Sequence, residues 1–259
     1  MRIITNLAKK ILPFSIRIIF RKLNWKIIYF KQVYLQGMRG DVYCPISEKK
    51  YKCFLKIRTY NQTPDNGAHS RHRLVWLFLK NKTKIFNENV SLLHIAPEFC
   101  FIKKFKSLKN LSYFPGDKMV EGYGKQDGVE YLDIMNMNFK DNSFDYILCN
   151  HVLEHVSDDK KAMKEIYRVL KKDGTAIITI PINEKLETTY EDSNITSPQE
   201  REKHFGQWDH VRWHGMDVKK TLETIGFKVE MIRYAEKFSA EENKKFGLCN
   251  DFIISAIKI

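Results

Sequence analysis

FDYILCNHVLEHVSDDKKAMKEIYRVLKKDGTAIITIP, which spans residues 144–181, is the stretch of this sequence that decides the fold. Residues 146–149 form a short apolar run typical of a buried strand, and residues 162–170 carry apolar side chains at helical spacing. Gly174 is expected to end this helix, because glycine tolerates the left-handed backbone that follows a last helical turn. Residues 176–180 predict a second apolar strand.

A strand, a helix and a second strand in this order predict a parallel pair of strands with the helix on one face. Neither strand alternates apolar with polar residues, which indicates a sheet covered on both faces. Ligands of such sheets bind beyond the carboxyl ends of the strands. The sequence therefore places a candidate site at Asn150, His151, Glu154 and His155, which follow the first of the two strands.

Length and cysteine usage limit the class of protein. The chain of 259 residues is long enough for one sizeable α/β domain and a small appendage. Its five cysteines are odd in number and include no Cys-x-x-Cys pair, which disfavours a disulfide framework and fits a reducing cytoplasm. No uninterrupted apolar run is long enough to span a bilayer.

The first 40 residues form a basic arm. They hold nine Lys and Arg residues and no Asp or Glu, against a net charge of +13 for the whole chain, and large apolar residues lie between these charges. Such a helix can lie in an anionic membrane surface, or it can pack its apolar side on the main domain with its charges solvated. The sequence leaves both alternatives open. Nucleic acid is not an expected partner, because the aromatic residues of the arm are mixed with aliphatic ones.

Three segments follow from the pattern along the chain: the basic helical arm at 1–40, a loop-rich segment at 41–73, and a regular segment at 74–259. The regular segment alternates helices with strands, which is typical of an α/β protein. The strands are expected at residues 91–95, 111–114, 129–132, 146–149, 176–180, 228–234 and 252–257, and the helices at 74–79, 99–109, 162–170 and 218–225.

The stretch at 144–181 resembles the S-adenosylmethionine-dependent methyltransferases of class I, the Rossmann-like class, and within it the type 11 family. The shared features are Phe144-Asp145 before the fourth strand, Asn-His-Val-Leu-Glu-His-Val at 150–156, and Tyr-Arg-Val-Leu-Lys-x-x-Gly at 167–174. The resemblance implies a Rossmann-like, seven-stranded, doubly wound sheet whose last strand runs antiparallel. It also implies methyltransferase activity with S-adenosylmethionine as the cofactor.

A closer resemblance is carried by Arg-His-Arg-Leu at 71–74 and Leu-His-Ile-Ala-Pro-Glu at 93–98. Both are similar to one bacterial subfamily of these enzymes, which is often found with polysaccharide biosynthesis genes. In that subfamily two Cys-Pro-x-Cys knuckles suited to tetrahedral zinc precede the Arg-His-Arg. Here the corresponding runs are Cys-Pro-Ile-Ser at 44–47 and Thr-Pro-Asp-Asn-Gly at 63–67. Three of the four expected thiolates are missing, so the knuckles are degenerate and we expect no bound metal.

The cofactor site is expected at the ends of the first four strands. Most relatives have a glycine-rich loop after the first strand, where this chain has His-Ile-Ala-Pro-Glu at 94–98. Asp117 follows about 20 residues later, at the spacing that dinucleotide-type sites use for an acid on the ribose hydroxyls, with capping of a turn as the alternative. The resemblance assigns adenine contacts to the residues after the third strand, and a place beside the sulfonium to the residue after the fourth. Glu98 is expected to pair with the ammonium of the cofactor or to cap a helix. The candidate cofactor-binding residues are therefore His94, Ala96, Glu98, Asp117, Asp133, Ile134 and Asn150.

The candidate catalytic residues lie after the fourth and fifth strands. His210 falls where such enzymes build the acceptor pocket, and it is the expected general base for a hydroxyl acceptor, with Asp209 or Glu154 as its orienter and a structural role as the alternative. His155 is expected in the wall of the pocket. The run at 151–155 also matches the H-x-x-E-H zinc-protease motif, but residues 157–159 interrupt the long helix that this motif needs. The catalytic candidates are His210, Glu154 and His155, and those for a sugar site are His204, Trp208, Arg212 and Trp213.

Two classes of function remain. The first is O-methylation of a glycan or another small hydroxyl-bearing acceptor, in the cytoplasm, with peripheral attachment to the inner membrane left open. The second is a non-catalytic interaction protein that keeps a cofactor fold, which the lost glycines and thiolates favour. The retained acids Asp117 and Asp133 and the run at 150–155 favour the enzyme.

Overall fold

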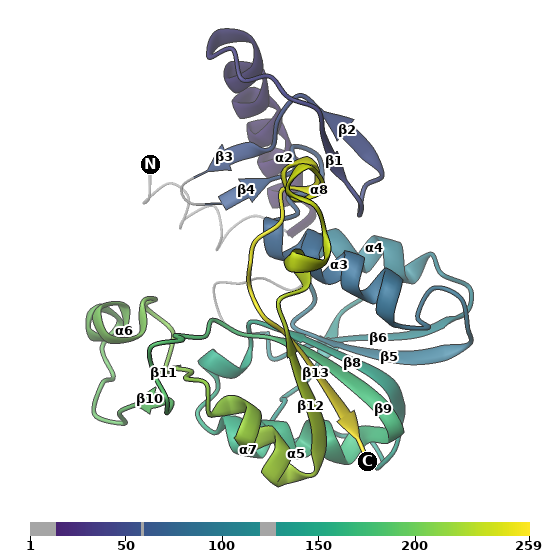
Figure 1. The fold of residues 1–259 in the computed structure, drawn as a ribbon, viewed down its shortest axis with the longest axis vertical. Helices are drawn as coiled ribbons and strands as arrows, with labels where there is room; N and C mark the ends of the chain where they lie inside the picture. Colours follow the sequence, from purple (N-terminus) through teal and green to yellow (C-terminus); the bar gives the residue numbers. More distant parts are fainter. Residues whose placement is uncertain (1–13, 58–59, 120–127) are drawn as a thin grey trace.

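The computed structural model describes residues 14–57, 60–119 and 128–259. Its centre is a seven-stranded sheet (Figure 1). From one edge to the other, the strands are β12 (Phe227–Ile232), β13 (Ile253–Lys258), β9 (Leu170–Thr179), β8 (Phe144–Asn150), β5 (Val90–Ile95), β6 (Leu111–Asp117) and β7 (Glu130–Tyr131). Strand β13 runs antiparallel to both of its neighbours, and the pairs from β9 to β7 are parallel. The predicted doubly wound sheet with an antiparallel last strand is confirmed.

Helices cover both faces of the sheet. Alternate residues of a strand point to opposite faces, so Leu93 and Ile147 enter one apolar core while Leu92 and Leu148 enter the other. The first core is closed by α5 (Asp159–Val169) and α7 (Val218–Ile225), and the second by α3 (Ser70–Lys82) and α4 (Phe99–Lys106). The apolar runs in the strands thus have the continuous pattern expected of a sheet buried on both sides.

Asp173 and Gly174, which were expected to end helix α5, lie within β9 instead. Helix α5 already begins at Asp159, because the carboxylate of Asp158 accepts a hydrogen bond from the backbone N–H of Lys161. The left-handed residue of this pair is Asp173, with φ of 61°, and not Gly174. Gly174 is needed for a different reason: a Cβ there would lie 2.8 Å from the carbonyl oxygen of Lys171. Glycine at 174 is thus explained by the lack of room for a Cβ and not by a left-handed backbone, so the predicted reason was wrong.

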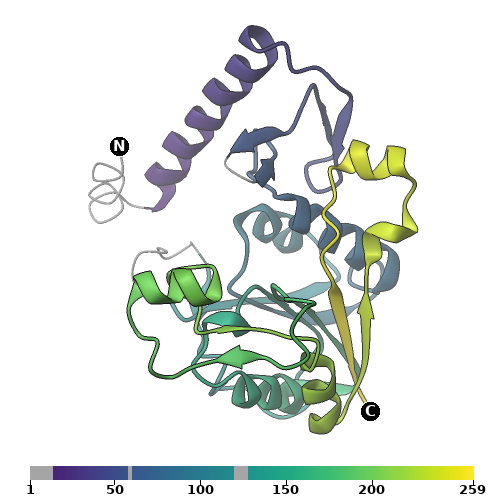
Figure 2. The same ribbon diagram turned by 60° about the vertical axis from the view of Figure 1, so that its left-hand side comes forward.

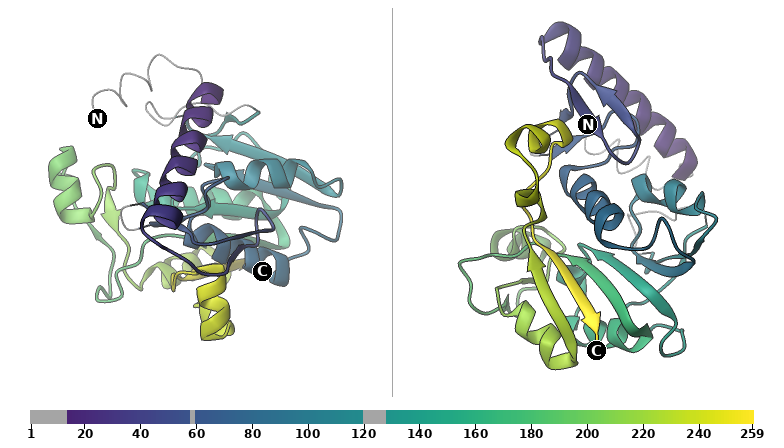
Figure 3. Two further views of the ribbon diagram at one scale, coloured as in Figure 1. Left: turned by 90° about the horizontal axis from the view of Figure 1, so that it is seen from above. Right: turned by 45° about the vertical axis from the view of Figure 1, so that its right-hand side comes forward.

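A small module made of hairpins lies at one end of the sheet (Figures 1 and 3). It contains the pairs β1 (Val42–Cys44) with β2 (Lys49–Tyr51) and β3 (Leu55–Ile57) with β4 (Tyr60–Gln62). The helix α2 (Phe14–Phe30), which continues as a π-helical turn η1 (Lys31–Leu35), and the helix α8 (Ala240–Phe246) complete the module. The loop-rich segment therefore folds into two short hairpins that are closed by α2 and α8.

Arg73 joins this module to the main domain. Its side chain is fully buried, and its guanidinium donates hydrogen bonds to the carbonyl oxygens of Ala68 (2.7 Å), Phe246 (2.6 Å) and Gly247 (2.7 Å). The same group stacks on the ring of Phe54, with its central carbon 3.8 Å from the ring centroid. One side chain of α3 therefore holds the C-terminal end of α8 against the hairpins.

The segment between β9 and α7 crosses the carboxyl edge of the sheet. It contains β10 (Tyr190–Glu191), α6 (Pro198–Phe205) and β11 (Arg212–Trp213), which lie on one side of the molecule (Figure 2). The short 3-10 turns η2 (Leu153–His155) and η3 (Tyr234–Lys237) are the remaining elements. Val211 donates its backbone N–H to the carbonyl oxygen of Glu154 at 2.9 Å, which brings this segment against the loop after β8. Among the described residues, no helix is long and apolar enough to span a membrane.

Candidate cofactor and acceptor site

The loop after β5 makes its turn without glycine. Ala96 has φ of 48°, which lies in the left-handed region that glycine normally occupies, and its N–H donates to the carbonyl oxygen of Gly116 at 2.8 Å. This conformation costs a non-glycine residue about 1–2 kcal/mol. Helix α4 begins directly afterwards at Phe99, so its N-terminal N–H groups lie at the carboxyl edge of the sheet. The backbone at Ala96 therefore makes the turn after β5 although no glycine is present.

Glu98 is the centre of a hydrogen-bonded cluster in this loop. His94 Nε2 lies 2.8 Å from Glu98 Oε2 and donates to it, since a carboxylate only accepts, and Asn150 Nδ2 donates to Oε1 at 3.0 Å. His94 is fully buried on β5, and its Nδ1 lies 2.9 Å from the hydroxyl of Tyr113. Burial raises the pKa of Glu98, but the hydrogen bond and charge of His94 outweigh it and lower that pKa to about 2. Glu98 is therefore ionised, and its carboxylate oxygens have the lone pairs to accept a hydrogen bond from an ammonium group.

The low pKa of Glu98 makes a testable contribution to stability. The folded-state pKa of about 2 lies below the ordinary value of 4.5, so this contribution is complete above pH 4.5 and is lost as the pH falls through 2. Urea unfolding at stepped pH should show a shallower acid loss of stability in Glu98→Gln than in the unchanged chain. Glu202→Gln, an exposed change on α6, should keep the steeper loss. Identical slopes for Glu98→Gln and the unchanged chain would contradict the prediction.

The two predicted acids for the ribose and the adenine lie at the ends of the next two strands. Asp117 is the last residue of β6, and its Oδ1 accepts the backbone N–H of Met119 at 3.0 Å, so the turn-capping role is present. Asp133 follows β7; its Oδ1 accepts the N–H of Met135 at 3.0 Å and its Oδ2 pairs with Lys118 at 3.0 Å. A carboxylate has lone pairs for more than one donor, so capping leaves a role toward a ligand open for both acids.

Three other predicted cofactor residues have internal roles in this structure. Asn150 uses both groups of its amide, since Nδ2 donates to Glu98 and Oδ1 accepts from the hydroxyl of Thr179 at 2.9 Å. His94 is likewise occupied by the carboxylate of Glu98 and by Tyr113. Ile134 is 3% exposed and packs within the apolar core. Asn150 and His94 therefore position Glu98, while Ile134 presents no open surface to a ring.

A second cluster contains the three catalytic candidates. The ligand-type atoms of Glu154, His155 and His210 lie within 4.8 Å of one another, and the rings of the two histidines meet edge to face at 4.8 Å between centroids. His151, with a left-handed backbone of φ 51°, places its Nδ1 3.0 Å from Glu154 Oε1. Glu154 Oε2 is buried and has no hydrogen-bond partner. The structure thus brings together the residues that sequence reasoning had chosen from two distant segments.

His210 is arranged as a neutral base. Its Nδ1 lies 3.1 Å from the carbonyl oxygen of Phe205 and must carry the proton, so the lone pair is on Nε2. Burial is the largest influence on the pKa of His210 and lowers it from the ordinary 6.5, although Glu154 acts in the opposite direction. His155 lies beside Asp209, with Nδ1 3.5 Å from Oδ2. The orienter of His210 is therefore the carbonyl of Phe205, a contact that the sequence did not reveal.

The same cluster bears on metal binding. Two imidazoles and a carboxylate are a donor set that catalytic zinc accepts, so these three side chains could hold a divalent ion. The alternative H-x-x-E-H arrangement does not form, because residues 153–155 adopt a 3-10 turn and His151 lies outside it. The expected absence of metal rests on the missing knuckle thiolates and stays a prediction.

Arg212 was wrongly interpreted as a candidate for binding sugar. It is 3% exposed, and its guanidinium donates to the carbonyl oxygens of Leu153, Val156 and Ser157 and pairs with Glu191 at 3.0 Å. Arg212 therefore fixes the η2 turn that carries Glu154 and His155. Exposed polar and aromatic surface is offered nearby by Trp208, which is 50% exposed, and by the exposed His204, which bonds Tyr190.

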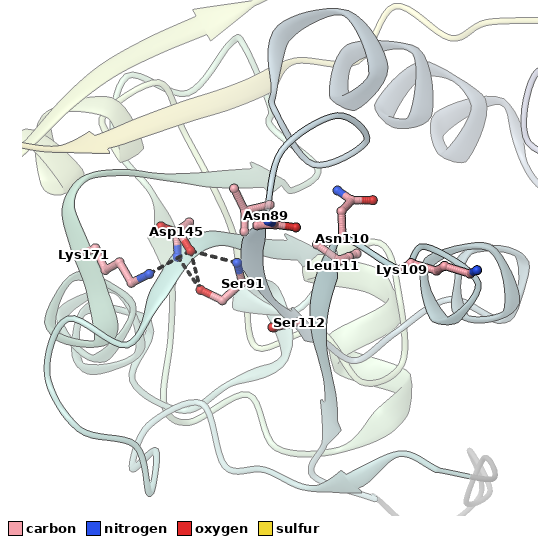
Figure 4. A pocket seen from close by; sticks show the side chains of 9 residues that line it. Asn89, Ser91, Lys109, Asn110, Leu111, Ser112, Asp145 and Lys171 are labelled. Carbon is pink, nitrogen blue, oxygen red and sulfur yellow. Dashed lines mark hydrogen bonds and ion pairs between the residues drawn. The ribbon is translucent and has the colours of Figure 1, made fainter.

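A hollow of about 330 Å³ lies at the opposite end of the sheet (Figure 4). It is formed by the amino ends of β5 and β6 and by Lys171, and its Asp145 already bonds Ser91 and Lys171. None of the predicted cofactor or catalytic residues lines it. Ligands of parallel sheets bind at the carboxyl ends of the strands, and this hollow lies at the amino ends. We therefore place the candidate site at the carboxyl ends, where the candidate cofactor and catalytic residues lie.

Comparison with known proteins supports the class that the sheet defines. Residues 115–178 match a family described as "Methyltransferase domain". The chain is 48% identical over 48 residues to the uncharacterized protein MJ0638 of Methanocaldococcus jannaschii, and 39% identical over 67 residues to the uncharacterized methyltransferase YcgJ of Bacillus subtilis. These matches cover 18% and 26% of this chain, and 21% and 25% of the two relatives. The chain thus spans about a quarter or less of the length of these curated relatives.

A solved structure is similar to this chain over a longer stretch. The crystal structure of YcgJ from Bacillus subtilis aligns with 73% of this chain and 99% of its own length, at 16% identity and a TM-score of 0.42. The strand order defines a Rossmann-like, doubly wound α/β sheet, and the segment from β6 to β9 is the part that matches the methyltransferase family.

Proposed function

We propose that this protein is an S-adenosylmethionine-dependent methyltransferase that acts on a hydroxyl group of a glycan or another small acceptor. The observation that carries the proposal is the buried, ionised Glu98 at the end of β5, followed by Asp117 and Asp133 at the ends of the next two strands. These carboxylates suit the ammonium, ribose hydroxyl and adenine amine groups of the cofactor in turn. The association with polysaccharide biosynthesis and the degenerate knuckles remain part of this proposal.

Methyl transfer needs few reactive groups from the protein itself. S-adenosylmethionine supplies the electrophilic methyl group when bound. Glu98, Asp117 and Asp133 would hold the cofactor, and the segment from β10 to β11 would hold the acceptor, so that most of the rate enhancement comes from proximity and alignment. A hydroxyl acceptor must also lose a proton. His210 Nε2 carries the lone pair that takes it, and the carbonyl of Phe205 keeps that tautomer in place.

A non-catalytic interaction protein is the alternative. Its main support was a first loop without glycine, but Ala96 makes the left-handed turn in place of glycine. A purely structural role also does not account for the cluster of Glu154, His155 and His210. Buried polar atoms normally have a hydrogen-bond partner, and Glu154 Oε2 has none. Both observations favour the enzyme.

The cytoplasm is the proposed location. Cys44, Cys53, Cys100 and Cys149 are buried as free thiols, and burial raises the pKa values of Cys53, Cys100 and Cys149. Uncrosslinked thiols of this kind fit a reducing compartment. The glycan or other hydroxyl-bearing acceptor would then be a cytoplasmic molecule or one presented at the inner face of the membrane.

Calorimetry with S-adenosylmethionine and its demethylated product tests the proposal. We expect a Kd of about 1 μM, or roughly −8 kcal/mol. Asp117→Ala should weaken binding about 10- to 100-fold, because a hydrogen bond to a charged group is lost. Asp117→Asn keeps the oxygen that caps Met119 and so separates the loss of the ligand contact from loss of the turn. Affinity undiminished in Asp117→Ala would remove Asp117 from the site, and no binding by the unchanged chain would favour the non-catalytic alternative.

Methyl transfer identifies the acceptor class. Tritium-labelled S-adenosylmethionine is incubated with panels of monosaccharides, nucleotide sugars, phenols and amines. Transfer to sugar or other hydroxyl groups is expected. Transfer to amines alone would contradict the proposed O-methylation while leaving the assignment as a methyltransferase intact.

A further inference from the structure

Helix α2 exposes a continuous apolar stripe. Its exposed side chains recur at intervals of three and four residues, which places them on one face of the helix. Their exposed fractions range from 38% for Ile16 to 68% for Tyr34. This stripe, called the α2 stripe below, consists of Ile16, Ile19, Phe20, Leu23, Ile27, Phe30 and, in the following turn, Tyr34. It is a large apolar surface for a protein to leave in water.

The opposite face of α2 is fixed to the hairpin module. Trp25 is 7% exposed and fills the space beside Gly67, where any Cβ would collide with the indole. Gln32 exchanges two hydrogen bonds with the backbone of Lys56, at 3.0 and 3.2 Å. The hydroxyl of Tyr29 accepts the N–H of Lys52 at 2.9 Å. The apolar residues of α2 therefore divide into a packed face and the exposed α2 stripe.

Positive charge borders the stripe on both sides. At 100° per residue, Lys22 and Lys26 fall along one edge and Arg17 along the other. The first 40 residues contain no Asp or Glu that could neutralise them. A helix with a wide apolar face and basic flanks is the arrangement that lies in the headgroup region of an anionic bilayer. A basic protein groove would repel these flanks and a neutral one would not attract them, whereas anionic headgroups do attract them, so the charge favours lipid.

We propose that α2 docks the protein on an anionic lipid surface by inserting the α2 stripe between the headgroups, with Lys22, Lys26 and Arg17 beside the phosphates. This goes beyond the proposed methyl transfer and does not depend on it. One contact links the two. Lys22 Nζ lies 5.4 Å from the centroid of the Phe99 ring, and Phe99 directly follows Glu98. Docking would therefore bring the loop after β5 close to the membrane.

Vesicle sedimentation with the full chain tests the proposal. Vesicles of phosphatidylcholine, with and without phosphatidylglycerol, are pelleted with the unchanged chain and with the Leu23→Glu/Ile27→Glu variant. These side chains are 53% and 59% exposed, so the fold should tolerate the change. Met216→Glu/Ile259→Glu is the matched control, because it adds the same charge at exposed apolar positions outside the arm. Thermal unfolding by circular dichroism confirms that each variant is folded.

The unchanged chain and the control should pellet with the anionic vesicles and bind the neutral ones more weakly. The stripe variant should bind about 10- to 100-fold more weakly than the control. Salt should weaken binding of the unchanged chain only in part, because insertion of apolar side chains is not screened. Equal binding by the stripe variant would overturn the proposal, since the attachment would then be purely electrostatic. The proposal would also be overturned if the unchanged chain did not bind vesicles but formed a dimer, and if the stripe variant did not dimerise. That result would show that the α2 stripe serves self-association.

Discussion

His210→Gln should lower kcat for methyl transfer about 10²- to 10⁴-fold, the usual contribution of a positioned general base. Glutamine can still donate a hydrogen bond to the carbonyl of Phe205, as His210 does at 3.1 Å, but it has no basic nitrogen. The Kd for S-adenosylmethionine should stay within about twofold of the unchanged value, because His210 is expected to touch only the acceptor. The measurement is the initial rate with the acceptor that the transfer panel identifies, together with calorimetry of cofactor binding.

The pH profile separates a base from a structural histidine. Because burial lowers the pKa of His210 below 6.5, the neutral form should predominate at pH 7, and kcat should fall only as the pH drops through that lowered value. In His210→Gln this acid limb should disappear. Lys245→Gln is the control, since Lys245 is exposed on α8, outside the candidate cofactor and acceptor site. A His210→Gln enzyme that keeps both its rate and its acid limb would show that the base is another group.

The sheet could be predicted because its signals are local. Continuous apolar runs such as residues 146–149 and 176–180 mark strands that are buried on both faces, and the order of runs along the chain sets the topology. The first and last residues of the helices could not be predicted as well, because they depend on single hydrogen bonds such as that from the N–H of Lys161 to the carboxylate of Asp158. The prediction for Asp173 and Gly174, which lie within β9, failed for a related reason. The two residues are adjacent, and only the backbone shows which of them is left-handed.

The site was predicted in part. Glu98, Glu154 and His210 were chosen for their chemistry and their place after strands, and the structure shows that Glu154 and His210 meet. The sequence could not show that His94 and Asn150 are used up in holding Glu98, because that depends on contacts across three strands. Arg212 was misjudged for the same reason. The sequence alone does not show whether an arginine after a strand binds a ligand or, as here, three carbonyl oxygens of its own chain.

The basic arm shows why one residue pattern supported two alternatives. Packing on the domain and exposure to lipid were treated as exclusive, yet Trp25 is buried while Leu23, two residues away, is 53% exposed. A helix has two faces, so both can hold for the same segment. The packed face rests on the hairpin module, whose own stability depends on buried contacts. Arg73 is the most prominent of these contacts.

Arg73→Leu should destabilise the protein by about 3–5 kcal/mol, the cost of removing one side of a buried, hydrogen-bonded charged group. Leucine fills part of the volume but leaves the carbonyl oxygens of Ala68, Phe246 and Gly247 without their donor around a buried side chain. Because these carbonyls join α8 to the hairpins, limited proteolysis should also cut near residues 240–250 earlier than in the unchanged chain. Urea unfolding followed by circular dichroism measures the stability change.

Two further variants distinguish the buried hydrogen bonds from the loss of a positive charge. Arg39→Leu removes the same charge from an exposed position and should change the free energy of unfolding by less than about 0.5 kcal/mol. Arg73→Lys keeps the charge but has one ammonium in place of the planar guanidinium fork, so it cannot reach all three carbonyls together and should fall between Arg73→Leu and the unchanged chain. Equal stability of Arg73→Leu and Arg39→Leu would mean that the module holds α8 without Arg73, through contacts such as that between the rings of Tyr43 and Phe246.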